Sequence, residues 1–179
     1  YKSHIAPSYR EFTMQQFNVS GILGKCYYTQ EYPSYIDTLW TRDIMSMHAK
    51  RDMSFYLYPE DDSAIQSMLK QKSTQLKAEL SDAMQKGITI DKEIEQQYRD
   101  VEMIREKLTT KEERYFELWN YTTIYDHNEE KLRETGKKFE QKISGYGIKV
   151  KNAIHRMDNG FTANLPICLD DMGIVRSAV

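Results

Sequence analysis

Two stripes of apolar residues at helical spacing dominate the middle of the chain. Between Asp62 and Gln85 the stripe consists of Ile65, Met68, Leu69, Leu76, Leu80, Ala83 and Met84. Between Asp91 and Leu108 a second stripe consists of Ile94, Tyr98, Val101, Ile104 and Leu108. Steps of three and four residues place each stripe on one helix face. Gly87 suits a helix C-terminus, and the short connection after it favours an antiparallel neighbour. The pattern predicts a helical hairpin over about residues 62–108.

Shorter patterns precede the hairpin. Aromatic and β-branched residues in Tyr9–Phe17 and Gly24–Tyr32 flank Asn18–Gly21, which predicts two strands joined by a turn. Ile36–Met47 carries Ile36, Leu39, Trp40, Ile44 and Met47 at helical spacing, so we expect a short helix on the sheet. Met53–Tyr58 alternates with period two and stops at Pro59, as a half-buried strand does.

The segments after the hairpin complete the expected order of elements. Arg114–Tyr125 has β-branched and aromatic residues on both faces, which predicts a central strand. Asp126 and Glu129 resemble a capping box before a helix over 128–144, with Leu132, Phe139 and Ile143 facing inward. A last strand is expected over 148–157. The order predicts one α+β domain over 1–179: a mixed sheet with helices packed on it, ferredoxin-like βαβ elements, and the hairpin as an insertion.

Composition narrows the class of protein. The chain has 179 residues, of which 40% are hydrophobic and 29% charged, so it can bury an ordinary core. Its formal net charge is −2, which argues against a polycation that coats nucleic acid. The two cysteines are far apart, and no segment resembles a signal peptide or a membrane span, so we expect two free thiols.

Familiar catalytic motifs are missing from the sequence. A P-loop requires Gly-x-x-x-x-Gly-Lys-Ser/Thr, and the two Gly-Lys pairs, at Gly24 and Gly136, lack both the earlier glycine and the following hydroxyl residue. Neither a Gly-x-Ser-x-Gly elbow nor a His-Glu-x-x-His zinc helix is present. The four histidines have no metal-ligand spacing with the cysteines, and His127 among acidic residues fits a solvated helix start better than an acid/base site. We therefore expect no catalytic, cofactor or metal site in this chain.

The order of several short motifs carries a family resemblance. They are Tyr32-Pro33 with Trp40 downstream, Asp52 before a strand closing at Tyr58-Pro59, the polar hairpin, Glu112-Glu113-Arg114 before an aromatic strand, and Asp158-Asn159-Gly160-Phe161 with Leu165-Pro166. In this order, over roughly residues 9–175, they resemble the N-terminal domain of the conjugative-transfer ATPases of type IV secretion systems, the TraC-like family that corresponds to the fourth VirB component.

The resemblance implies a function. In that family the P-loop lies C-terminal to this region, so ATP and Mg²⁺ are expected only for an ATPase domain that this chain does not contain. The domain itself would be a non-enzymatic docking and assembly module that positions the motor on the membrane channel for DNA transfer. Its partners would be inner-membrane components of the secretion system, its own ATPase domain and neighbouring subunits. We expect a cytoplasmic location at the inner face of the membrane.

One surface feature supplies candidate interaction residues. The segment from Lys131 to Arg156 has eight basic residues against two acidic ones. The candidates are Lys131, Arg133, Lys137, Lys138, Lys142, Lys149 and Lys151. They could face anionic lipid or DNA, or form an ordinary solvated face balanced elsewhere. An autonomous nucleic-acid-binding module using this segment is the alternative function, and an enzyme of unrecognised type is a third class. The polar hairpin is a second candidate docking surface.

Overall fold

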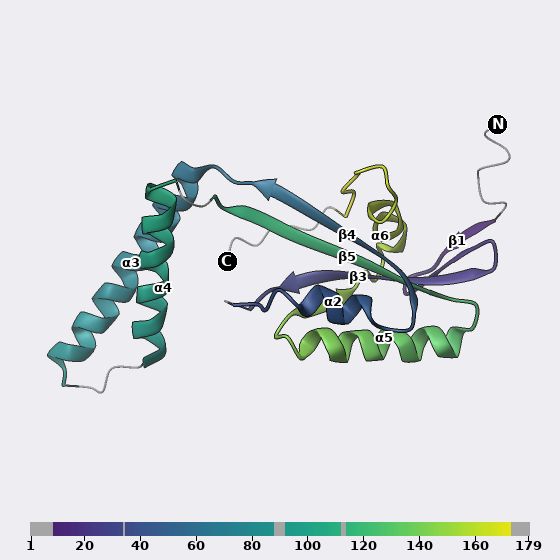
Figure 1. The fold of residues 1–179 in the computed structure, drawn as a ribbon, viewed down its shortest axis with the longest axis horizontal. Helices are drawn as coiled ribbons and strands as arrows, with labels where there is room; N and C mark the ends of the chain where they lie inside the picture. Colours follow the sequence, from purple (N-terminus) through teal and green to yellow (C-terminus); the bar gives the residue numbers. More distant parts are fainter. Residues whose placement is uncertain (1–8, 34, 88–91, 112–113, 173–179) are drawn as a thin grey trace. The chain divides into compact units, whose positions relative to one another are not determined.

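The computed structural model describes residues 9–33, 35–87, 92–111 and 114–172, and it has the α+β class that the sequence predicts. Six strands and five helices lie within these residues (Figure 1). The strands are β1 (Arg10–Phe12), β2 (Phe17–Val19), β3 (Ile22–Glu31), β4 (Lys50–Pro59), β5 (Phe116–Asp126) and β6 (Lys149–Asn152). The helices are α2 (Trp40–Met45), α3 (Asp62–Gln85), α4 (Lys92–Thr109), α5 (Glu129–Ser144) and α6 (Met157–Ala163).

The sheet is antiparallel, so the prediction of a mixed sheet was wrong. Its order is β1-β2-β3-β5-β4, and β6 pairs with β3 beyond the stretch that β2 occupies. The two crossovers, β3-α2-β4 and β5-α5-β6, each connect strands that have one other strand between them. Strands that run in the same direction are therefore never neighbours. β5 lies between β3 and β4, which confirms the predicted central strand.

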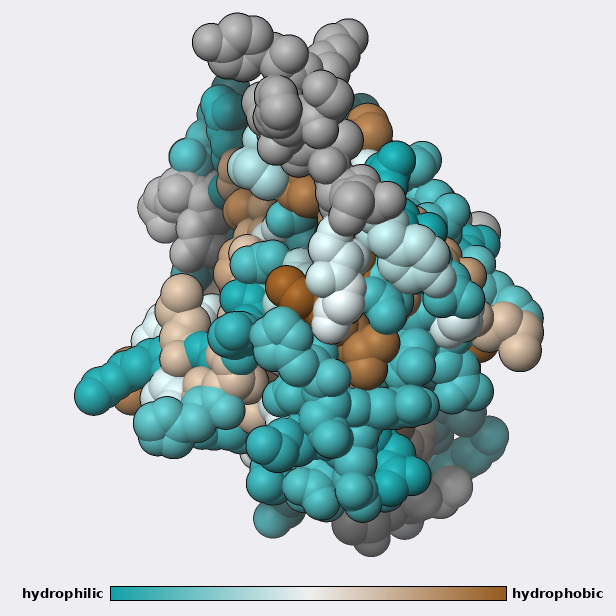
Figure 2. All heavy atoms as spheres, turned by 90° about the vertical axis from the view of Figure 1, so that its right-hand side faces the viewer, coloured by the Kyte–Doolittle hydropathy of each residue, from teal (hydrophilic) through white to brown (hydrophobic). Residues whose placement is uncertain are grey.

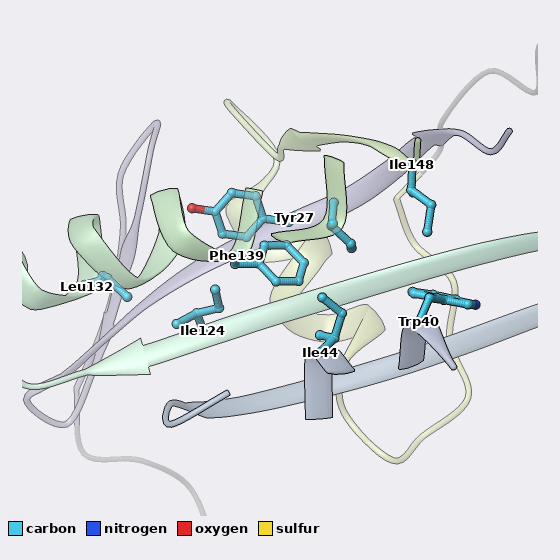
Figure 3. Close-up of a cluster of buried hydrophobic side chains, with 8 residues drawn as sticks. Tyr27, Trp40, Ile44, Ile124, Leu132, Phe139 and Ile148 are labelled. Carbon is cyan, nitrogen blue, oxygen red and sulfur yellow. The ribbon is translucent and has the colours of Figure 1, made fainter. Parts of the chain in front are cut away.

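Both α2 and α5 cover one face of the sheet. The core there is built from Tyr27 of β3, Ile124 of β5, two residues of α2, three of α5 and Ile148 (Figure 3). The three from α5 are Leu132, Phe139 and Ile143, as the sequence predicted, and none is more than 1% exposed. Tyr27 and Phe139 are in ring contact, with centroids 5.2 Å apart. This core fixes which side of α5 faces solvent.

The opposite face is covered by α6 and the segment that follows it. Here the predicted strand over 148–157 exists as β6 but is shorter: it ends at Asn152, and His155 has a positive φ of 63° that breaks the extended backbone before α6 begins. Gly160 of α6 lies against Cys26, where a Cβ at position 160 would come within 2.6 Å of the cysteine Cβ. The segment after α6 is held by tyrosine hydroxyls, with Tyr56 donating to the Ala163 carbonyl at 2.7 Å and Tyr121 to Asp170 at 2.8 Å.

The first part of the chain is more broken than predicted. The expected strand Tyr9–Phe17 is divided into β1 and β2, because Thr13 closes a tight turn through hydrogen bonds with Gln16. The turn at Ser20–Gly21 lies where the sequence placed it. The expected helix over 36–47 is shorter than predicted: Asp37 accepts the Leu39 N–H, and α2 spans only the six residues Trp40–Met45.

The predicted capping box of Asp126 and Glu129 was wrong, because another residue is the N-cap of α5. The Asn128 side chain caps α5, accepting the Lys131 N–H at 3.0 Å, while Asp126 accepts the Asn128 N–H at 2.9 Å. An N-cap side chain reaches the amide two or three residues later, and Asn128 has the required extended backbone. The helix nevertheless begins within one residue of the predicted start.

The hairpin belongs to a second compact unit, residues 57–118. α3 spans the predicted 62–85, and Gly87 follows it with a positive φ of 63°, as a C-terminal glycine should. The connection 88–90 lies outside the described residues. Ile65, Leu69 and Leu108 form a small buried cluster joined by Met68 and Val101, which shows that α3 and α4 run antiparallel.

Polar contacts continue the hairpin seam, and no pattern in the sequence indicated them. Ser73, only 6% exposed, donates to the Glu102 carboxylate at 2.5 Å, and Glu102 also accepts from Arg105 at 2.5 Å. Leu76 is buried as predicted, at 2% exposed, whereas Ile94 and Tyr98 are half-buried, and Ile104 and Met84 are exposed. The seam therefore combines apolar contacts with one part-buried hydrogen-bond network.

Candidate interaction surface on α2 and α5

The candidate surface starts from the amphipathic character of α5. Leu132, Gly136, Phe139 and Ile143 form its buried side and face the sheet. Gly136 is required there because a Cβ at this position would lie 2.2 Å from the Tyr27 hydroxyl oxygen. The close approach of helix and strand leaves the remaining α5 side chains to solvent, and these include most of the predicted basic residues.

The structure places the seven predicted residues on two elements. Lys131, Arg133, Lys137 and Lys138 are exposed on α5, Lys142 is half-buried on the same helix, and Lys149 and Lys151 are exposed on β6. In the face shown in Figure 2, the lower part, which corresponds to the α5 side of Figure 1, is largely hydrophilic. The predicted basic segment is therefore mainly the solvent side of one helix.

Ion pairing removes two residues from the predicted set. Arg133 lies 3.9 Å from the Glu130 carboxylate, and Lys149 lies 2.7 Å from that of Glu31. Both pairs are exposed, so each has little net effect on stability, but each lowers the positive charge at its position. Among the residues that the structure describes, the other five lysines of the set form no ion pair.

Helical geometry divides the α5 lysines. At about 100° per residue, Lys131, Lys138 and Lys142 fall within roughly 40° of one another. Lys137 lies on the side of the helix that also carries Glu130, Arg133 and Glu140. The three lysines at positions 131, 138 and 142 thus form a stripe of their own, with Glu134 as the nearest acidic residue on the helix surface.

This stripe borders α2. The Lys142 ammonium donates to the Ser46 hydroxyl at 3.4 Å, and Tyr146, just after α5, donates to the Asp43 carboxylate. The Asp43 carboxylate raises the pKa of Tyr146, mainly through this hydrogen bond. The two helices present one continuous surface to solvent.

Two apolar side chains of the α2 region lie on that surface. Leu39 is 52% exposed and Met45 is 66% exposed, and Arg42 between them is exposed as well. The sequence pattern predicted Leu39 as an inward residue, which was wrong because Leu39 precedes the first turn of α2. We call the set Leu39, Arg42, Met45, Lys131, Lys138 and Lys142 the α2–α5 face.

The structure offers no convergent chemistry elsewhere in its described residues. A hollow of about 310 Å³ at the start of α5 is lined by Lys25 and Arg133 but also by Glu129 and Glu130, so its charges oppose one another. No group of three metal-ligating side chains occurs among the described residues. Burial raises the pKa of the Cys26 thiol to about 12, so this cysteine is an unreactive core residue.

Most motif residues that carry the family resemblance have structural roles. The ring centroids of Tyr32 and Trp40 lie 6.3 Å apart, and the Asp52 carboxylate accepts a hydrogen bond from the Tyr125 hydroxyl at 2.7 Å. Phe161 packs edge to face against Phe17 at 5.0 Å. Glu112 and Glu113 lie outside the described residues. The three contacts give the motif residues concerned a role in packing.

Comparison with protein-family models and with curated protein sequences finds no match for this chain. No helix in the described ranges has both the length and the apolar character that crossing a bilayer requires.

Proposed function

We propose that this chain is a docking and assembly domain of a conjugative-transfer ATPase of the TraC-like type, and that it positions the motor at the membrane channel. The catalytic cycle, with its ATP and Mg²⁺, belongs to a P-loop domain outside this chain. The domain works as a cytoplasmic module at the inner face of the membrane, in contact with inner-membrane components of the channel and with neighbouring subunits.

Two features of the fold support this proposal. The strand order β6-β3-β5-β4, with α2 and α5 on one face, is the order of a ferredoxin-like βαββαβ arrangement. The hairpin of α3 and α4 is inserted between β4 and β5, at the place that the resemblance requires. A ferredoxin-like sheet serves many functions, so the fold agrees with the family without identifying it.

The observation that carries the proposal is the α2–α5 face. Its three lysines have no ion-pair partner among the described residues, and its two apolar side chains are more than half exposed. The core does not need these side chains, because α5 is fixed by Leu132, Phe139 and Ile143 on its other side. A surface that the fold does not use fits a positioning role.

The family assignment has a direct test. Reading the encoding gene downstream of the Val179 codon should reveal Gly-x-x-x-x-Gly-Lys-Ser/Thr within a few hundred codons. A stop codon immediately after Val179 would contradict the assignment. The nucleic-acid alternative predicts strongly salt-dependent binding of duplex DNA by the purified chain, which the docking proposal does not.

A further inference from the structure

We propose that the α2–α5 face binds directly to an anionic lipid bilayer surface, with Leu39 and Met45 entering the interface and the lysines contacting headgroups. The inference rests on the positioning role proposed above and names the partner for it. It concerns the 179-residue chain alone, so it can be tested without the motor.

Charge selects an anionic partner. Lys131, Lys138 and Lys142 lie along one flank of α5, and Arg42 adds a fourth positive charge from α2. Asp43 of α2, which keeps its charge while accepting the Tyr146 hydroxyl, and Glu134 of α5 oppose part of this charge, so four basic groups stand against two acidic ones. Each Lys or Arg held close to an anionic membrane contributes on the order of 1 kcal/mol, so this excess of basic groups favours reversible adsorption.

The apolar residues favour lipid over a nucleic acid. Leu39 and Met45 are 52% and 66% exposed, and Met45 directly precedes Ser46, which accepts a hydrogen bond from Lys142. A phosphodiester backbone offers nothing to such side chains, whereas the boundary between headgroups and acyl chains accepts them. Tyr146, which borders this face, donates its hydroxyl to Asp43, so the preference for lipid rests on the two apolar side chains.

The shape of the surface also agrees with a bilayer. Neither the hollow at α5 nor the one at α4 is lined by a residue of the α2–α5 face. Lysine ammonium groups on flexible stems suit a fluid layer of headgroups, because they act as point charges without a fixed bidentate geometry.

The experiment measures binding of the purified chain to vesicles by co-sedimentation. Vesicles of phosphatidylcholine with 30–40% phosphatidylglycerol, roughly the anionic fraction at which surface potential becomes effective, are compared with pure phosphatidylcholine. The test variant is Lys131→Gln, Lys138→Gln and Lys142→Gln together. A matched control carries three glutamines at lysines outside the face, Lys70, Lys72 and Lys137, and so has the same net charge.

The proposal predicts binding to the anionic vesicles only, weakened about 100-fold in the test variant by the loss of three membrane-facing charges and little changed in the control. A second variant, Leu39→Ser with Met45→Ser, should weaken binding roughly tenfold at unchanged charge.

Equal loss in the test and control variants would show attraction by charge alone and overturn the proposal, as would absence of vesicle binding. If the test variant weakened the binding of duplex DNA as much as the binding of vesicles, the face would be a general polyanion surface and the proposal would be overturned. Specific vesicle binding together with a gene that lacks a downstream P-loop would leave this inference standing and remove the motor assignment.

Discussion

Gly136→Ala should destabilise the protein even though alanine is the better helix former. Inside a helix this exchange normally stabilises by up to about 1 kcal/mol. Here the new methyl group would lie 2.2 Å from the Tyr27 hydroxyl oxygen. The Tyr27 ring cannot move aside easily, because it is 1% exposed and packs on Phe139. Overpacking of this kind costs roughly 1–3 kcal/mol, so we expect a net loss of about 1–2 kcal/mol.

A second substitution separates the clash from other effects. In Tyr27→Phe the oxygen is gone, and the next ring atom, Cζ, lies 3.4 Å from the position of the new methyl group, which is an ordinary contact. The buried hydroxyl interacts with the Glu140 carboxylate, so its removal alone should cost about 0.5–1.5 kcal/mol, which the single variant measures. In the Tyr27→Phe background, Gly136→Ala should therefore stabilise by about 0.5–1 kcal/mol.

Urea unfolding followed by tryptophan fluorescence measures the effect. Both tryptophans, Trp40 and Trp119, belong to the unit that contains the sheet and α5, so the signal reports that unit. The two backgrounds should differ by about 1.5–3 kcal/mol in the effect of Gly136→Ala, which is a strong coupling for residues in contact. An equal effect of Gly136→Ala in both backgrounds, or stabilisation in the native one, would refute the packing of α5 on Tyr27.

Three further predictions concern the hairpin and the thiols. Leu76→Asp or Val101→Asp should lower helicity in circular dichroism while the tryptophan transition persists, and loss of that transition would make the hairpin part of the core. Hydrogen bonds from Ser73 and then Arg105 lower the pKa of Glu102. The ionised Glu102 therefore stabilises the hairpin above the ordinary carboxyl pKa, and this stabilisation is lost as the pH falls through the folded-state pKa. Acid should reduce hairpin helicity more in the native chain than in Glu102→Gln. With a thiol reagent near pH 8, exposed Cys168 should react quickly and Cys26 only after unfolding, and two fast thiols would contradict the burial of Cys26.

Sequence periodicity predicted the long elements well because their side chains repeat over several turns. α3 has the predicted bounds, and β5 is central as its two-sided apolar pattern indicated. The errors lie where few residues determine the backbone. The turn at Thr13–Gln16, the positive φ at His155 and the cap at Asn128 each depend on one or two hydrogen bonds or dihedral angles that leave no periodic signal.

The candidate site was predicted in composition but not in arrangement. The basic segment was visible because lysines and arginines are counted directly in the sequence. The sequence did not show which of these basic residues are paired, because the ion pair of Lys149 with Glu31 joins residues 118 positions apart. Leu39 and Met45 join the surface only through the packing of α2 beside α5, and the helical spacing around Trp40 assigned Leu39 to the core instead.

The most direct test of the positioning role uses the intact motor in a mating assay. Lys131, Lys138 and Lys142 are changed together to Glu, and Lys70, Lys72 and Lys137 are changed to Glu as the matched control. The account predicts that the first variant loses membrane association and DNA transfer while its ATPase activity stays near the native value, and that the control behaves like the native motor. Normal association and transfer by a well-folded first variant would contradict it.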